Sequence, residues 1–157
     1  MTNIKRNLLF ILFCFLTLFF CILLFLSRDF LITDKIDQVD KPVKPCDLHL
    51  ESCFSYFDHN KKLSFSINPK PIPVLKPLEL EVQLFNLQAS KVKVEIKGLN
   101  MDMGSNFSLL KSKGKSIFKG EIILPSCMME TMQWQTKITI TTEKETLQSQ
   151  FYFSTKK

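Results

Sequence analysis

Apolar and polar residues alternate with a period of two along most of the chain beyond residue 60. This alternation places successive side chains on opposite faces of a strand, and it is typical of strands with one buried face. No segment past residue 30 keeps a 3.6-residue period long enough for a helix. The segments that alternate are residues 62–67, 78–84, 92–96, 107–110, 117–124, 133–140 and 147–153.

These short strands predict an all-β domain, an immunoglobulin-like or cupredoxin-like β-sandwich of about seven strands. Lys113-Gly114-Lys115 predicts a hairpin turn, and a second turn is expected near Glu143-Lys144. Four prolines fall in residues 68–77. Because proline lacks a backbone N–H, this segment is expected to be a crossing loop or an edge.

The N-terminus predicts one transmembrane helix ahead of this domain. Residues 8–26 contain no charge, glycine or proline. A helix of that length spans about 28 Å, close to the hydrocarbon thickness of a bilayer. Lys5 and Arg6 precede the run, so the positive-inside bias places the N-terminus in the cytoplasm and the C-terminal domain outside. The expected location is a bacterial inner membrane, with a single span and a periplasmic domain.

A cleaved signal peptide is the alternative for the same run. The run is longer than the usual signal core, and Leu26-Ser27-Arg28 offers no cleavage site with two small residues. An uncleaved anchor is therefore favoured. The expected organisation is a cytoplasmic tip and anchor over residues 1–27, an extended linker over 28–45 and the β-domain over 46–157.

The formal net charge of +6 raises the question of nucleic-acid binding. Lys91, Lys93 and Lys97 alternate with apolar residues in one strand, which predicts a solvated strand face rather than a nucleic-acid surface. The predicted location across a membrane also separates the domain from nucleic acid. No nucleic-acid partner is expected.

Sulfur-bearing side chains are concentrated in two short segments. Apart from the initiator, every methionine lies within residues 101–132, together with Cys127, and the only tryptophan, Trp134, follows two residues later. Thioether and thiolate are soft ligands, and together they select Cu(I) over harder divalent ions. The methionines concerned are Met101, Met103, Met128, Met129 and Met132.

Two loops are expected to carry this cluster, near residues 98–105 and 125–132. In an extended chain the spacing of two would point Met101 and Met103 to the same side. If both loops share one end of the sandwich, then Met101, Met103, Cys127 and Met132 form a candidate Cu(I) site, with Trp134 as a candidate cap over the cation. Met128 and Met129 are weaker candidates, since adjacent residues point apart.

The alternative interpretation is that these methionines pack in the core and bind no metal. Methionine is a flexible residue that fills gaps in cores. Cysteine pairing is also open: the spacing of Cys46 and Cys53 favours a disulfide between them and a free Cys127, but a bond from Cys127 to either would remove it as a ligand.

Other chemistry is sparse. His49 and His59 do not match a zinc spacing and are interpreted as solvated. The chain shows no Ser/His/Asp arrangement, phosphate loop, carboxylate pair or C-x-x-C motif, so an enzyme is not expected and a thiol-redox role ranks last.

The segment from Val94 to Gly104, with its Met101-Asp102-Met103-Gly104 turn, together with Leu124-Pro125-Ser126-Cys127 and Trp134, resembles the bacterial YtkA-like and FixH-like membrane-anchored proteins. The resemblance covers about residues 60–155. It implies an N-terminal anchor, a small β-sandwich and, for some members, copper handling or cytochrome oxidase assembly. It carries Met101, Met103 and Cys127 over as site residues.

The leading hypothesis is a membrane-anchored carrier of Cu(I) or an assembly factor for a metalloprotein. Its expected partners are the bilayer, through residues 8–26, and a copper-dependent membrane enzyme or another envelope protein. The alternative is a structural or protein-interaction module of an envelope complex that binds no metal.

Overall fold

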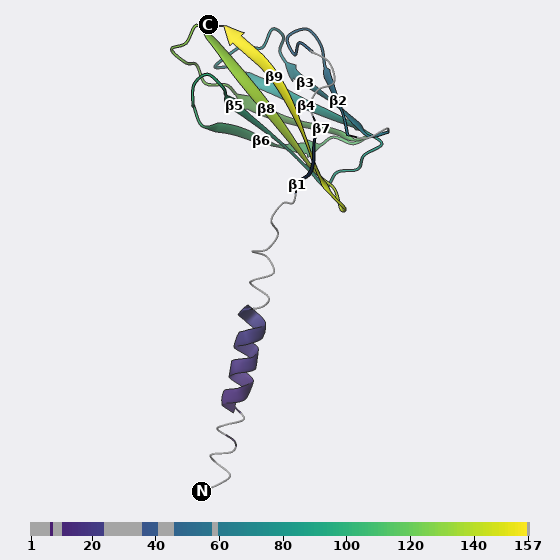
Figure 1. Ribbon diagram of the computed structural model, residues 1–157, viewed down its shortest axis with the longest axis vertical. Coiled ribbons are helices and arrows are strands. Elements are labelled where there is room, and N and C mark those ends of the chain that lie inside the picture. Colours follow the sequence, from purple (N-terminus) through teal and green to yellow (C-terminus); the bar gives the residue numbers. More distant parts are fainter. Residues whose placement is uncertain (1–6, 8–10, 24–35, 41–45, 58–59, 157) are drawn as a thin grey trace. The chain divides into compact units, whose positions relative to one another are not determined.

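The computed structural model describes residues 7, 11–23, 36–57 without 41–45, and 60–156 (Figure 1). The chain divides into two compact units, Met1–Lys35 and Ile36–Lys157. In the first unit residues 11–23 are α-helical, and their large apolar side chains are exposed. The other residues of the expected anchor, 8–10 and 24–26, lie outside the described residues. Within the part of the chain that the structure describes, no helix is long and apolar enough to cross a membrane.

The second unit is built from strands, which confirms the all-β class. Each of the seven strands predicted from the alternating pattern is present. Most of their apolar positions are buried, whereas Phe107, Leu109 and Ile123 are exposed. The strands are β1 (Ile36–Asp40), β2 (Cys53–Tyr56), β3 (Lys62–Asn68), β4 (Pro77–Phe85), β5 (Lys91–Gly98), β6 (Ser105–Ser112), β7 (Ile117–Ile123), β8 (Thr131–Thr141) and β9 (Thr146–Lys156).

β1 and β2 were not predicted from the pattern. β2 is short, and too few of its residues alternate to stand out. β1 lies inside the stretch expected to be an extended linker, where it pairs in parallel with the first residues of β9. That pairing gives the backbone N–H and C=O groups at the edge of β9 hydrogen-bond partners. The hydrophobic pattern of β1 gives no sign of it, because backbone groups make the contact.

The strands are hydrogen-bonded into one continuous nine-stranded sheet in the order β1-β9-β8-β5-β6-β7-β4-β3-β2. β8 and β9 are the longest strands and run side by side as an antiparallel pair (Figure 1). A sandwich in the strict sense has two separate sheets, whereas these strands form one continuous sheet. β6 is the reason, because its first residues pair with β5 and its last two, Lys111 and Ser112, pair with β7.

The sheet encloses a single core. Phe65 on β3 and Phe151 on β9 are far apart in the strand order, yet their ring centroids are 5.5 Å apart. Side chains from both ends of the sheet therefore share one interior. Burying a large apolar side chain contributes about 1.5–3 kcal/mol, and this interior holds Trp134, Phe65 and many aliphatic residues with no exposed surface.

The register of β5 against β8 determines which loops are neighbours. Gly98, the last residue of β5, pairs with Trp134 near the start of β8, while Lys91 pairs with Thr141 at the other end. The loop after β5 and the segment before β8 therefore lie at the same end of the domain. These are the two segments that carry the sulfur side chains.

Candidate metal centre

The loop after β5 is fixed to the start of β8 by hydrogen bonds. Asn100 donates from Nδ2 to the carbonyl of Thr131 at 2.9 Å, and its Oδ1 accepts the N–H of Gln133 at 3.1 Å. The N–H of Leu99 also donates to the carbonyl of Gln133 at 2.8 Å. One side chain thus uses both its donor and its acceptor across the two segments, and residues 98–104 and 124–132 are neighbours.

This juxtaposition brings Met101 and Cys127 into contact. The thiol of Cys127 lies 2.8 Å from Sδ of Met101 and donates to it. Cys127 is half-buried and not in a disulfide, and Met101 is 39% exposed. The N–H of Met129 points at Sγ of Cys127 from 3.5 Å. We call the two contacting atoms the sulfur pair.

Two further methionines lie beside Cys127. Met129 and Met132 line the same small pocket as Cys127, with a volume of about 10 Å³. That volume holds about one water-sized sphere, so the pocket has room for a single ion and no larger ligand. Met132 is only 3% exposed, whereas Met129 is 44% exposed, so the pocket has a buried and a solvent-facing methionine.

Met103 and Met128 lie in other environments. Residues 99–104 form a bent loop rather than an extended strand, with Asp102 Oδ1 accepting the N–H of Gly104 at 2.9 Å. The alternation expected for Met101 and Met103 does not apply to a bend, and Met103 packs against the core outside the pocket. Met128 is 90% exposed. Met129 was expected to be as weak a candidate as Met128. Its N–H contacts Sγ of Cys127, and its side chain lines the pocket.

Trp134 does not cap the sulfur pair. Its side chain is fully buried, its ring stacks on Phe153 with a centroid distance of 6.5 Å, and Nε1–H donates to Oγ1 of Thr155 at 2.9 Å. A ring face already covered by core residues is not available to a cation. The alternation of β8 places Trp134 on the same inward face as Ile138 and Ile140.

The donor set of the sulfur pair suits a soft ion. Bonds from a metal to thiolate sulfur are about 2.3 Å long in zinc sites, so two sulfur ligands of one ion lie about 3.8 Å apart or more. Met101 and Cys127 must therefore separate by about 1 Å to hold an ion between them. Both side chains lie in loops, but Met101 is exposed whereas Cys127 is half-buried, so Met101 is the side chain expected to move.

Cys46 and Cys53, the pair that the spacing favours, are joined in a disulfide. This leaves Cys127 as the free thiol of the β-domain among the described residues. The bond ties residue 46, ahead of the turn at residues 48–50, to the buried side of β2.

His49 is a structural residue that the sequence did not reveal. Its Nδ1 accepts the N–H of Ile72 at 3.1 Å, so its Nε2 carries the proton and donates to the carbonyl of Ser154 at 2.6 Å. The ring is half-buried with both nitrogens occupied, rather than solvated as expected. It is not a ligand in this arrangement. His59 lies outside the described residues.

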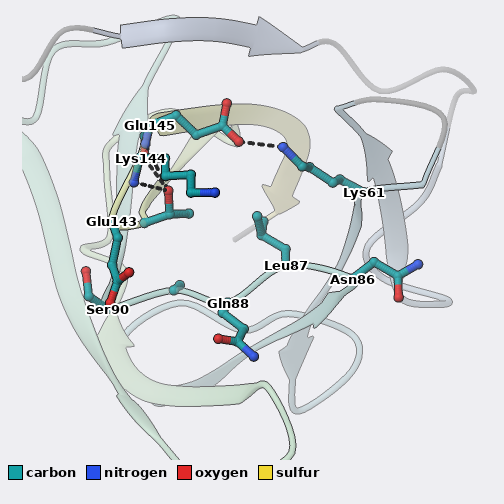
Figure 2. Close-up of a pocket in the computed structure, with 10 residues that line it drawn as sticks. Lys61, Asn86, Leu87, Gln88, Ser90, Glu143, Lys144 and Glu145 are labelled. Carbon is teal, nitrogen blue, oxygen red and sulfur yellow. Dashed lines mark hydrogen bonds and ion pairs between the residues drawn. The ribbon is translucent and has the colours of Figure 1, made fainter.

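A larger pocket lies at the opposite end of the domain, with a volume of about 540 Å³ (Figure 2). It is formed by the loop between β4 and β5 and the turn between β8 and β9. Lys61 and Glu145 close one side as an ion pair of 2.6 Å, and Thr142 Oγ1 accepts the N–H of Glu145. These contacts hold the turn between β8 and β9, and neither methionine nor cysteine lines this pocket, so it is not the candidate site for a soft metal.

No protein-family model, curated protein or solved structure matches this chain. Within the described ranges, no three His, Cys, Asp or Glu side chains come together in a way that would hold a metal ion. Methionine is not among those four types, so the candidate centre rests on its own geometry.

Replacing Gly98 with alanine is expected to disturb the centre. A β-carbon at Gly98 would collide with the carbonyl oxygen of Met101 and lie 2.9 Å from Cε of Met132. The loop would have to shift, which we expect to lower the free energy of unfolding by about 1–3 kcal/mol. Urea unfolding of the full chain in detergent, followed by the fluorescence of Trp134, measures this.

The matched control for Gly98→Ala is Gly114→Asn. Gly114 has a φ of 84° and open space around its Cα, and asparagine tolerates that backbone conformation. We expect its unfolding free energy to stay within about 1 kcal/mol of wild type. If Gly98→Ala were no less stable than Gly114→Asn, the close packing of the loop against Met132 would be refuted.

Proposed function

We propose that this protein is a membrane-anchored, extracytoplasmic carrier of Cu(I), or an accessory factor that delivers it to a copper-dependent membrane enzyme. Met101 and Cys127 bind the ion directly, and Met132 and Met129 complete the ligand set from the same pocket. Met103 supports the loop from the core side. Cu(I) accepts thioether and thiolate ligands together, whereas harder ions prefer oxygen and nitrogen.

The observation that carries this proposal is the contact between the two sulfur atoms. Met101 and Cys127 are 26 residues apart in sequence, and Sδ and Sγ lie 2.8 Å from one another. Cys127 also lines a small pocket together with Met129 and Met132. A thioether needs to lose no proton to bind a metal, so only the thiol of Cys127 links binding to pH.

A competition titration of the full chain with a coloured Cu(I) chelator tests the proposal. We expect the reduced protein to take one equivalent of Cu(I) from the chelator in a saturable way, and Zn²⁺ to compete poorly. Blocking Cys127 with iodoacetamide should weaken the binding, because alkylation replaces the charged thiolate with a neutral and bulkier thioether. Failure to compete with even a weak chelator would exclude a Cu(I) carrier.

The anchor is supported by sequence and by exposure. The apolar run of residues 8–26 has the length of a membrane span, and the helix over residues 11–23 exposes Ile11, Leu16 and Phe20 at 55–67%. Such a helix is costly in water and stable in lipid. The disulfide between Cys46 and Cys53 fits an oxidising compartment, as expected if the domain is periplasmic.

The finer description of the fold belongs to the same proposal. The two halves of the continuous sheet share one core, and β6 passes from one half to the other, which supports an immunoglobulin-like sandwich with a strand that switches sheets. This arrangement is also what the resemblance to YtkA-like and FixH-like proteins implies.

Topology gives a separate test of localisation. In intact cells expressing the full chain, a membrane-impermeant maleimide should label Cys127, since Cys46 and Cys53 are bonded and Cys14 and Cys21 fall within the apolar run. The protein should resist extraction from membranes by carbonate. Leu16→Arg/Phe20→Arg should release it, because each arginine costs about 2.5–3.5 kcal/mol at the centre of a span.

The control for the anchor is Leu16→Ile/Phe20→Ile, which preserves the apolar run and should stay in the membrane fraction. Labelling of Cys127 only after cell lysis would contradict the extracytoplasmic placement. Release of the isoleucine variant together with the arginine variant would show that the loss has another cause.

The alternative function is a metal-free structural or interaction module of an envelope complex. Met132 is buried and Met103 packs against the core, and simple packing accounts for both. Packing gives no reason for a partly exposed Met101 to contact a free thiol. For this reason we favour the Cu(I) carrier over the metal-free module. The titration separates them, since the alternative requires no saturable Cu(I) binding.

A further inference from the structure

One edge of the sheet is open along β6. Residues Ser105–Leu110 of this strand are ladder-paired with β5 on one side. β7 pairs only with Lys111 and Ser112, so among the described residues no strand pairs with the other side of Ser105–Leu110. β6 and β7 part from each other at this point, and the backbone groups of the free edge face the gap.

A groove occupies the fork between β6 and β7. It has a volume of about 440 Å³ and is lined by Ser108, Leu109 and Lys111 of β6 and by Lys119, Gly120 and Glu121 of β7, with Lys113 and Glu79 at its margins. Gly120 lets the strands approach at the base of the fork, where a β-carbon would meet Leu110 and Ser108 at 2.5–2.7 Å. The groove borders the C-terminal part of β6, at Ser108, Leu109 and Lys111.

The open edge carries large apolar side chains. Phe107 is 68% exposed and Leu109 is 57% exposed. Both side chains are exposed, and both residues belong to the part of β6 that pairs with β5 but not with β7. Edge strands are usually protected by charge, proline or a bulge, so exposed phenylalanine and leucine at an unpaired edge indicate a surface that is covered in a complex.

The surroundings of the edge are strongly basic. Lys93 lies over the ring of Phe107, 5.0 Å from its centroid. In the described part of the chain none of the lysines along β5, β6 and the following turn has an ion-pair partner, and the neighbouring carboxylate of exposed Glu121 has none either. These lysines are Lys91, Lys93, Lys97, Lys111, Lys113 and Lys115.

The nearby charges that are paired do not offset this. Glu95 is bound by Lys137 at 2.9 Å, and that hydrogen bond holds the pKa of Glu95 below its usual value. Lys119 contacts Glu81 and Glu79, and these contacts raise the pKa of Lys119. β5 is an interior strand, paired with β6 and β8, so the charge of its lysines acts on whatever covers β6.

Charge decides between the two strands that fit this edge. A second copy, paired through β6, would bring the two sets of lysines together, and like charges across a ladder are destabilising. An acidic strand would be attracted instead. We propose that the free edge of β6 binds an extended acidic segment of a partner protein by strand addition, with apolar residues of that segment resting on Phe107 and Leu109.

The mode of binding sets the chemistry of the partner. Main-chain hydrogen bonds to an edge supply affinity without regard to sequence, and alternate side chains supply specificity. The free edge is long enough for a strand of about six residues. The segment that fits therefore alternates Glu or Asp with β-branched residues. This surface is distinct from the sulfur pair, and its test does not depend on copper.

The test uses two fluorescent peptides of about ten residues. One alternates valine with glutamate and the other alternates valine with lysine. Anisotropy titration with the full chain should show the glutamate peptide binding at least about tenfold more tightly. Its affinity should fall between about 20 mM and about 150 mM salt, as expected for exposed charges.

Two variants locate the site. Lys111→Glu/Lys113→Glu should weaken binding of the glutamate peptide about tenfold through charge. Phe107→Thr/Leu109→Thr should weaken it similarly through lost apolar contact while keeping residues suited to a strand. The matched control Lys76→Glu/Lys144→Glu makes the same charge change at exposed positions that do not line the groove, and it should change the affinity less than about twofold.

Equal affinity for the two peptides would overturn the proposal, and so would equal effects of the groove and control variants. Sedimentation gives a further outcome. A dimer that is lost in Phe107→Thr/Leu109→Thr would show that a second copy covers β6, and the acidic partner would be rejected.

Discussion

Replacing Cys127 with serine is expected to weaken Cu(I) binding by about a hundredfold or more. Loss of a residue that only supports a metal ligand commonly costs ten- to a hundredfold, so loss of a ligand should cost at least the upper end of that range. Serine keeps the size of the side chain and its hydrogen-bonding capacity but replaces a soft donor with a hard one. The competition titration of the full chain measures this change directly.

Met101→Leu is the companion variant, since leucine matches methionine in volume and lacks the sulfur. We expect a smaller loss than for Cys127→Ser, about tenfold, because a neutral thioether is a weaker ligand than a thiolate. Met128→Leu is the matched control, as Met128 is 90% exposed and outside the pocket. Equal effects of Met101→Leu and Met128→Leu would reject the sulfur pair as the site.

Trp134→Ala is expected to have the largest effect on stability of any single substitution in the core. Trp134 has no exposed surface and stacks on Phe153. Truncating a buried tryptophan to alanine costs about 3–5 kcal/mol, a large share of the about 5–15 kcal/mol that stabilises a typical domain. Thermal unfolding of the full chain, followed by circular dichroism because the only tryptophan is removed, measures the loss.

Trp134→Phe separates the two roles considered for this residue. Phenylalanine keeps most of the buried ring but leaves Oγ1 of buried Thr155 without its donor, which should cost about 1–3 kcal/mol. Cu(I) affinity should be unchanged in this variant, because the indole lies in the core. A clear drop in affinity with little loss of stability would restore Trp134 as a cap and contradict the structure.

The two experiments address different properties of the same end of the domain. The sulfur pair lies on loops and is partly exposed, whereas Trp134 lies in strand β8 with a fully buried ring. A variant that loses stability and affinity together would indicate that the loop has moved. For this reason each titration needs the unfolding curve of the same variant beside it.

The position of the strands was predictable because alternation is a local property. A strand with one buried face needs apolar residues at every second position, and β3, β4, β5 and β8 satisfy that requirement with few exceptions. β1 lacks such a pattern, and it depends on the free edge of β9. An edge-to-edge pairing of two strands so distant in the chain leaves no mark within either segment.

The candidate site was predictable in its chemistry and only partly in its members. Composition pointed to soft donors at residues 101–132. The loop after β5 bends, which turns Met103 toward the core and Met101 toward Cys127. The bend therefore removes Met103 from the set of candidate metal-binding residues. Met129 entered the pocket for an equally local reason, the contact of its N–H with Cys127.

By itself the sequence determined the all-β class and the positions of seven strands, and it pointed to a soft metal as the candidate bound ion. These follow from the period of a strand and from the chemistry of side chains, neither of which needs distant contacts. The tertiary structure alone decided that Met101 meets Cys127, that Trp134 is enclosed and that β6 leaves an open edge. Each of these depends on the hydrogen-bond register between strands far apart in the chain, and register is fixed by the packing of the whole core.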